Sequence, residues 1–310
     1  AWATYTIGTE ITLASVGSSV SFRGDNSTFS TAAGYYQFVM TGTIEASGNT
    51  MSLVDSTCKS LTIPGKSCFR GLFRGCTSLT TAPALPATTL AEWCYDEMFE
   101  GCTSLTTAPA LPATTLATNC YQWMFNGCTS LTTAPALPAT TLATSCYYHM
   151  FNGCASLTSA PALPATTLAG YCYGAMFKGC TSLTTAPALP ATTLAVHCYN
   201  AMFQGCTALT TAPALPATTL AASCYSAMFN GCTKLSSIEV SFTLWNLASY
   251  QTLDWVNSVA PSGTFTKPAA LATEYGADRI PTGWTVVDKS ELLTFTALAP
   301  NSTVKLNKVG

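Results

Sequence analysis

The dominant pattern along the chain is a unit of 26 residues in which apolar and polar positions recur in the same order. Between its cysteines the unit reads, nearly unchanged, C-T-S-L-T-T-A-P-A-L-P-A-T-T-L-A-x-x-C-Y-x-x-M-F-x-G. A fixed period of this length, with Leu, Ala and Cys at set places, indicates a leucine-rich-repeat solenoid whose turns bury their apolar faces against one another. The predicted fold class is therefore mainly β, a stacked array rather than a globular enzyme core. The period is marked by Cys76, Cys102, Cys128, Cys154, Cys180, Cys206 and Cys232.

Within one turn, the pattern predicts a short strand, a second extended arm at 88–91 and a compact convex turn at 95–101. Pro83 and Pro86 each remove a ladder donor, so the sheet formed by that segment should be short and interrupted. The side chains expected to point inward are Leu79, Ala82, Ala84, Leu90, Cys94, Phe99 and Cys102.

The segments before and after the repeat predict three further parts of the chain, an N-terminal domain, a C-terminal cap and a tail. Residues 1–55 alternate apolar and polar positions between glycine-rich turns, which predicts a small antiparallel β-domain. The solenoid should span 56–240, beginning with a shortened, Lys- and Arg-containing capping turn. A C-terminal cap at 241–288 should include a helix-like stretch at 246–260. Residues 289–310 form a strand-like tail with apolar positions at Leu293, Phe295, Leu298, Val304 and Leu306.

Composition narrows the possible partners. Charged residues make up 8% of the 310 residues and the net charge is −2, whereas about a quarter of an average chain is charged. Nucleic acid and anionic membrane surfaces are therefore poor electrostatic partners. No apolar run is long enough to cross a bilayer, so we expect no membrane insertion. Fifteen cysteines with so little charge favour a secreted or cell-surface location.

The cysteines recur in pairs eight residues apart, for which three arrangements are open. They can bridge within each turn, bridge between adjacent turns, or stay as buried thiols that act as small hydrophobic side chains. The spacing does not match a zinc site, and no His or carboxylate recurs with it, so we expect no metal and no cofactor. The disulfide candidates are Cys68, Cys76, Cys94, Cys102, Cys120, Cys128, Cys146, Cys154, Cys172, Cys180, Cys198, Cys206, Cys224 and Cys232.

The six near-identical units differ mainly at five places, which stack into a stripe on the convex side. The competing explanation is that exposed positions drift without constraint. Exposed aromatic side chains, however, are enriched in binding surfaces. The predicted binding stripe comprises Trp93, Glu97, Trp123, Tyr148, His149, Tyr171 and His197. No nucleophile motif or phosphate-binding glycine loop is present, and no carboxylate or serine recurs with either histidine, so we do not expect an enzyme.

The string Met98-Phe99-Glu100-Gly101-Cys102-Thr103-Ser104-Leu105 resembles the BspA-like leucine-rich repeats of bacterial surface proteins. The resemblance covers residues 58 to about 240, and the strings around 263–265 and 280–286 are similar to the C-terminal cap of such proteins. One difference is that Cys94 and its equivalents stand where the family usually has an aliphatic residue. The resemblance implies an adhesin that binds host or neighbouring-cell proteins.

Two functions follow from these features. The first, which the sequence favours, is a structural subunit that assembles head-to-tail into surface filaments. The tail resembles the opening strands of a β-domain in tandem BspA-like proteins, so residues 289–310 would complete the N-terminal β-domain of the next molecule. The alternative is a monomeric or tandem adhesin that binds a protein or glycan through the stripe.

Overall fold

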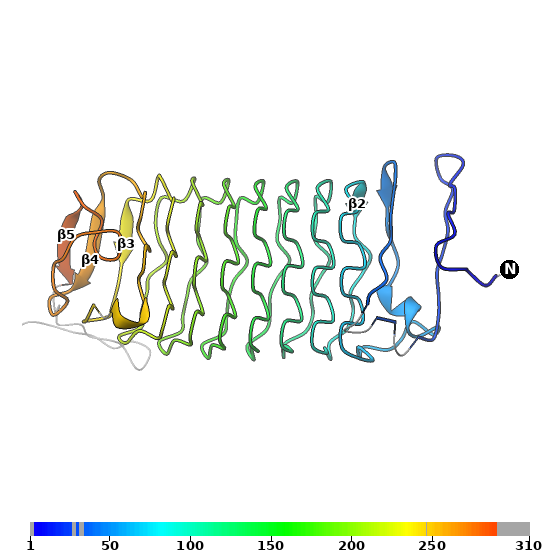
Figure 1. Ribbon diagram of the computed structural model, residues 1–310, viewed down its shortest axis with the longest axis horizontal. Coiled ribbons are helices and arrows are strands. Elements are labelled where there is room, and N and C mark those ends of the chain that lie inside the picture. The colour runs from blue at the N-terminus through cyan, green and yellow to red at the C-terminus, as the bar shows by residue number, and fades with distance from the viewer. Residues whose placement is uncertain (1–2, 27–28, 31–33, 246, 290–310) are drawn as a thin grey trace, which may run out of the picture.

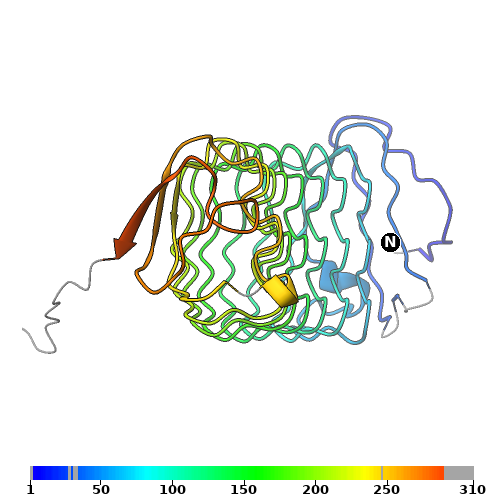
Figure 2. The same ribbon diagram turned by 60° about the vertical axis from the view of Figure 1, so that its left-hand side comes forward.

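The computed structural model describes residues 3–26, 29–30, 34–245 and 247–289. Successive turns of the chain stack into an elongated rod, with the N-terminal segment at one end and the last strands at the other (Figure 1). Viewed closer to the axis, the turns follow one another as nested loops of similar outline (Figure 2). The predicted solenoid is therefore confirmed as the architecture of the described residues.

Regular secondary structure is short and lies at the two ends of the rod. In chain order the elements are β1 (Ile44–Glu45), the 3-10 helix η1 (Thr50–Leu53), β2 (Leu79–Thr81), β3 (Ser237–Glu239), the 3-10 helix η2 (Leu247–Ser249), β4 (Thr264–Pro268) and β5 (Thr285–Lys289). Strands β1 and β2 pair in parallel, and β3, β4 and β5 form a second parallel sheet in that order.

Between these ends, the Ala-Pro side of each turn pairs with its neighbours only at single positions. Parallel bridges join Thr107 to Thr133 and Thr115 to Thr141, each pair 26 residues apart. The prolines between these positions have no N–H to donate, so a longer ladder cannot form. The expected short and interrupted sheet is thus present.

The opposite side of each turn consists of consecutive β-turns, and we call it the turn face (residues 92–101 and their equivalents in later units). Along the turn face, backbone N–H groups donate alternately to carbonyl oxygens of the next turn and to carbonyl oxygens of their own turn. Tyr95 donates to Cys120 O (3.0 Å) in the next turn, and Met98 donates to Tyr95 O (3.2 Å) within its own turn. This division pairs the backbone of the turn face both within and between turns without a sheet or an α-helix.

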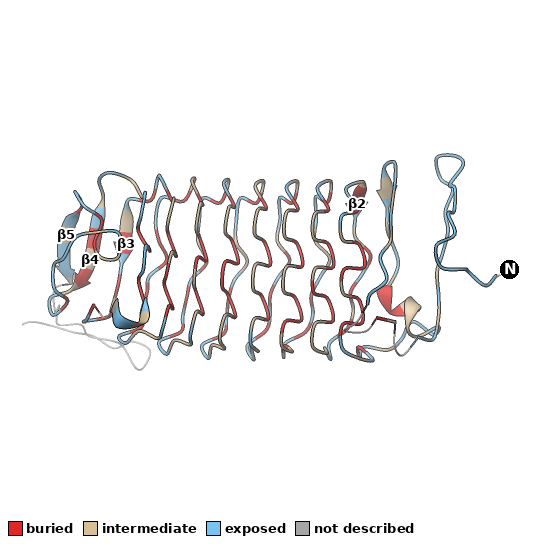
Figure 3. Ribbon diagram, viewed as in Figure 1, coloured by how far each residue is buried: buried red, intermediate tan, exposed pale blue. Residues whose placement is uncertain are grey.

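Buried positions recur in successive turns along the rod (Figure 3). The core they form consists of columns of identical side chains. Phenylalanine rings from Phe73 to Phe229 stack with centroids 5.4–5.9 Å apart, and tyrosine rings from Tyr95 to Tyr225 stack at 5.8–6.0 Å. Such offset aromatic contacts add stability beyond the area that they bury. Each turn therefore depends on both neighbours for its core.

The predicted inward set is partly correct. Cys94, Phe99 and Cys102 are fully buried, as is Leu79. Ala84 is exposed, because the neighbouring Leu85 takes the inward position instead. The sequence reasoning also missed the tyrosine column and the methionine that follows it in each unit, both of which are buried.

The N-terminal antiparallel β-domain predicted for 1–55 is not present in the described residues. The strand found there, β1, pairs in parallel with β2 of the solenoid. Phe38 stacks on Phe73 at 5.3 Å, and Phe22 packs on Phe38 at 5.4 Å. The alternation that suggested a separate sheet instead extends the phenylalanine column, so the solenoid begins well before residue 56.

The predicted helix at 246–260 is also wrong beyond the short η2. Residues 250–258 form another turn face, because Tyr225 and Phe229 donate to Gln251 O (2.9 Å) and Trp255 O (2.8 Å). The left-handed positions in this segment, Tyr250, Asp254 and Ser258, are four residues apart. The apolar residues between them therefore recur at a spacing close to that of a helix. The solenoid thus continues past residue 240 into the β3–β5 sheet. The predicted tail at 289–310 lies outside the described residues except for its first position, Lys289.

A candidate binding surface on the turn face

The backbone of the turn face has an unusual conformation at stripe positions. Trp93, Trp123 and His149 have φ values of 60°, 55° and 57°, and Tyr171 and His197 lie in the same left-handed region. A bulky side chain at positive φ costs about 1 kcal/mol or more, whereas Gly and Asn tolerate it. Equivalent positions in other units hold small or polar residues, including Asn119, Ser145 and Ala175.

Five of the seven predicted stripe residues come together in one cluster of rings. Trp123 stacks on His149 with centroids 4.0 Å apart and planes 8° apart, and Tyr171 stacks on His197 at 4.4 Å and 11°. Tyr148 joins the two pairs through edge contacts to His149 (4.3 Å, 77°) and Tyr171 (6.0 Å, 87°). We call these five residues, which span four adjacent turns, the aromatic cluster.

Tyr148 holds its place because the next turn leaves room for it. A Cβ atom on Gly174 would lie 2.9 Å from Tyr148 Cδ2, so a side chain at that position would displace the Tyr148 ring. The Tyr148 ring is nearly perpendicular to both stacked pairs, and these pairs stack along the rod. The ring therefore extends along the rod from its own turn onto the next.

Burial keeps the aromatic cluster uncharged. Desolvation lowers the pKa of His149 to about 4, and the positive charge of Lys178 contributes to the shift. Desolvation also lowers the pKa of His197. Both imidazoles are consequently neutral near pH 7.

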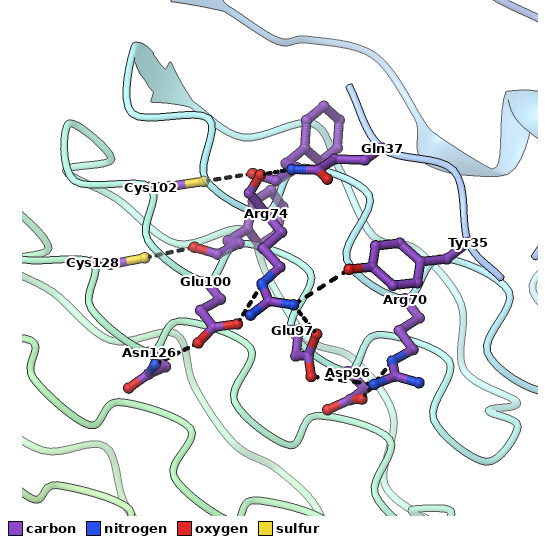
Figure 4. Close-up of polar contacts among 12 residues, drawn as sticks. Tyr35, Gln37, Arg70, Arg74, Asp96, Glu97, Glu100, Cys102, Asn126 and Cys128 are labelled. Atoms are coloured by element: carbon purple, nitrogen blue, oxygen red, sulfur yellow. Dashed lines mark hydrogen bonds and ion pairs between the residues drawn. The ribbon is translucent and has the colours of Figure 1, made fainter. Parts of the chain in front are cut away.

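The remaining two stripe residues, Trp93 and Glu97, lie apart from the aromatic cluster. Glu97 belongs to an ionic cluster with Arg70, Arg74, Asp96 and Glu100 (Figure 4), and Trp93 lies at its edge. The Arg70 guanidinium lies 5.8 Å from the centroid of the Trp93 ring. Arg74 Nη1 donates to Glu97 Oε2 (2.9 Å), and Arg74 Nε pairs with Glu100 Oε2 (2.8 Å). The arginines of the capping turn therefore bind the carboxylates of the next turn.

Asp96 is the buried member of this ionic cluster. Its Oδ2 lies 3.0 Å from Arg70 Nε, and its side chain is 1% exposed. Neither carboxylate oxygen accepts a hydrogen bond from the described residues. The pKa of Asp96 is raised to about 7, mainly by burial and also by the nearby negative charge of Glu97, while the positive charge of Arg70 opposes the shift.

A row of amide side chains continues from the ionic cluster beside the aromatic cluster. Asn126 Nδ2 donates to Glu100 Oε1 (2.9 Å), and Asn152 Nδ2 donates to Asn126 Oδ1 (2.7 Å). We call Asn126 and Asn152 the amide row. Both residues occupy one of the five variable places of the unit, but the predicted stripe did not include them. Their repetition at one place in adjacent units was the available signal.

Of the three cysteine arrangements that the sequence left open, neither disulfide arrangement is present, since all fifteen cysteines, each of which lies in the described residues, are free thiols. The two cysteines of one turn belong to different columns. Cys102 Sγ donates to Phe73 O of the preceding turn (3.0 Å), whereas Cys94 Sγ lies 4.0 Å from Cys120 O of the following turn. Burial raises the pKa of Cys68 to about 12 and of Cys76 to about 11. The structure therefore corresponds to the alternative of buried thiols.

Features suited to catalysis or metal binding are sparse on the described surface. A shallow hollow between two adjacent turns is lined by Ala, Pro and Leu side chains of 134–138 and 161–164, none of them ionisable. Among the described residues, no three His, Cys, Asp or Glu side chains are grouped so that they could hold a metal ion.

Comparison with known families agrees with this architecture. Residues 50–184 and 144–252 match the family described as BspA type leucine-rich repeat region, in six copies. The chain belongs to this family. The resemblance seen in the sequence is therefore confirmed for the greater part of the chain. A search of curated proteins found no match.

Membership of the BspA-type family carries a general functional statement. BspA-type proteins are repeat proteins, typically of the cell surface, and the family is not known for catalysis. In the part of the chain that the structure describes, no helix has the length and apolar character needed to cross a bilayer.

Proposed function

We propose that this BspA-type protein is a non-enzymatic surface protein that binds a protein or glycan through the aromatic cluster. The observation that supports this function most is the choice of residue at strained positions. Trp123, His149, Tyr171 and His197 occupy left-handed backbone where smaller residues of other units fit at lower cost. Free drift would not gather four such rings into two stacked pairs that Tyr148 joins.

The proposed function is tested by removing rings while keeping the fold. In a Trp123→Ser, Tyr148→Ser, His149→Asn variant, we expect attachment to fall at least about tenfold on arrays of extracellular-matrix proteins and of glycans. Tyr250→Ser is the matched control, since Tyr250 is 61% exposed and has a positive φ on the last turn face. Circular dichroism should be unchanged in both variants. Full attachment by the folded triple variant would leave drift as the explanation for the stripe.

A second candidate function is head-to-tail assembly into filaments, for which the N-terminal segment provides a reason. Tyr5, Ile7, Ile11 and Leu13 have exposed fractions of 43%, 69%, 42% and 39%, although they alternate as in a strand with one buried face. Alternating apolar side chains in an extended segment without a sheet partner suit pairing with a strand of another chain. In this proposal, residues 289–310 of a neighbouring copy supply that strand through the apolar positions of the tail.

Filament assembly has its own test. Full-length protein should form rods of increasing length at high concentration under the electron microscope, and deletion of 289–310 should abolish them. A heterologous contact of this kind does not close, so it propagates. Filaments that persist after the deletion, or a full-length protein that stays monomeric, would contradict the assembly proposal without affecting the binding proposal.

A further inference from the structure

The ligand chemistry of the aromatic cluster can be narrowed from its shape and its surroundings, in an inference that rests on the proposed binding function. The cluster has one ring, Tyr148, that extends along the rod between two stacked pairs whose planes are nearly perpendicular to it. Since the pairs belong to successive turns, the cluster covers three turn spacings of about 5.8 Å, as measured between the Tyr147 and Tyr173 rings of the core. This length suits an elongated ligand rather than a single small ring.

The surroundings of the aromatic cluster are rich in amides. The amide row of Asn126 and Asn152 follows one side, and the half-buried Gln122 and Asn200 occupy neighbouring turn-face positions. Each amide carries two N–H donors and a carbonyl acceptor. Adjacent hydroxyl groups both donate and accept, so amides match them, whereas an aliphatic rim would suit the apolar core of a protein interface better.

Charge is nearly absent from the same surface. From Gly101 to Thr233 the chain contains a single Asp, Glu, Lys or Arg residue, which is Lys178. Charged partners are usually matched by complementary charges that steer association. A surface with one cation over five units offers no such match to an acidic glycan or to a highly charged protein face.

Aromatic rings and amides together favour one class of ligand. The C–H groups on the face of a sugar ring carry partial positive charge, and the π face of an aromatic ring is negative. Sugar hydroxyls can then bond to flanking amides. We propose that the aromatic cluster binds an uncharged oligosaccharide along the rod axis, with Tyr148 as the central contact and Trp123 and Tyr171 beside it.

Binding can be measured with defined sugars on the full chain. The probes are cello-, xylo-, manno- and malto-oligosaccharides of six or seven units, with a sulfated heparin oligosaccharide as the charged comparator. We expect quenching or a shift of tryptophan fluorescence and a calorimetric signal with at least one neutral probe. Binding should change little between low and high salt, because no ion pair is formed. The heparin fragment should bind more weakly than that neutral probe.

Variants separate ring contact from general damage. Tyr148→Ser should lower the affinity for the neutral probe at least about tenfold. Tyr148→Phe should bind the same probe with an affinity within a few-fold of that of the wild type. Gly174→Ala should weaken binding because its Cβ displaces the Tyr148 ring. Tyr250→Ser is the unaffected control.

Three outcomes would overturn the carbohydrate assignment. They are no binding of any neutral probe at millimolar concentration, tighter binding of the sulfated probe, and unchanged binding by the folded Tyr148→Ser variant. If the protein attaches to an immobilised protein through the aromatic cluster but binds none of the sugars, the proposed binding function stands and the carbohydrate assignment falls. If the Trp123, Tyr148 and His149 triple variant attaches as well as the wild type, the proposed function itself fails.

Discussion

Replacing Asp96 by Asn should stabilise the N-terminal turns at neutral and alkaline pH, although it removes a partner of Arg70. The Asp96 carboxyl is buried, and neither of its oxygens accepts a hydrogen bond from the described residues. Arg70 Nη2 also lies 3.3 Å from Glu97 Oε1, so the cation stays paired in the variant. A buried ion pair with poor geometry often costs more in desolvation than it returns.

The expected gain in stability follows from the pKa of Asp96. Burial raises the pKa of Asp96 from 3.8 to about 7, so between these values the native state binds more protons than the unfolded state. The contribution of Asp96 to stability is therefore fully present below about pH 4 and is lost as the pH rises through about 7. A shift of about three units corresponds to about 4 kcal/mol at most. We expect Asp96→Asn to match the wild type near pH 4 and to exceed it by about 2 to 4 kcal/mol at pH 8.

Hydrogen exchange measured by mass spectrometry suits this test, because a solenoid can open one end without unfolding globally. Peptides covering 69–101 should exchange more slowly in Asp96→Asn than in the wild type at pH 8, and the difference should vanish toward pH 4. Comparing the two proteins at each pH removes the intrinsic pH dependence of exchange. Peptides from 199–232 serve as an internal reference, and Glu10→Gln, at an exposed carboxylate, is the matched control. Parallel pH profiles, or faster exchange in the variant at pH 8, would refute this reasoning.

Three further predictions concern the core and the backbone. Without reductant, a thiol reagent should label Cys58 alone in the native protein and all fifteen cysteines after denaturation, because the other fourteen are buried free thiols; denatured protein that resists labelling would show bridges. Phe151→Ala should cost about 3 to 5 kcal/mol in urea unfolding, since the ring is fully buried between two stacked neighbours, and a loss below 1 kcal/mol would contradict the packing. Gly263→Ala should lower the melting temperature and loosen the β3–β4 pairing, because the new Cβ would lie 2.4 Å from Ser236 O, whereas Gly34→Ala meets no atom within 4 Å and should have little effect.

The repeat, its stacking and the surface that varies could all be predicted from the order of the amino acids. A strict period places equivalent residues above one another in any solenoid, so the cysteine columns, the buried Leu79 and Phe99 positions and the stacking of the variable positions into a stripe followed from spacing alone. The prolines likewise predicted the interrupted pairing, because a missing N–H is a property of the residue.

The direction in which each side chain faces and the two ends of the solenoid depend instead on contacts between turns. Left-handed backbone at residues 93 and 97 turns Tyr95 inward and separates Cys94 from Cys102, and no local period encodes such turns. Strand-like alternation before residue 56 and helix-like spacing after 246 were both misread, because their hydrogen-bond partners lie in neighbouring turns rather than nearby in the sequence. The division of the stripe into an ionic cluster and an aromatic cluster has the same origin. Glu97 joins the ionic cluster, and Trp93 lies at its edge, because the preceding turn presents Arg70 and Arg74, whereas Trp123 has His149 on the turn that follows.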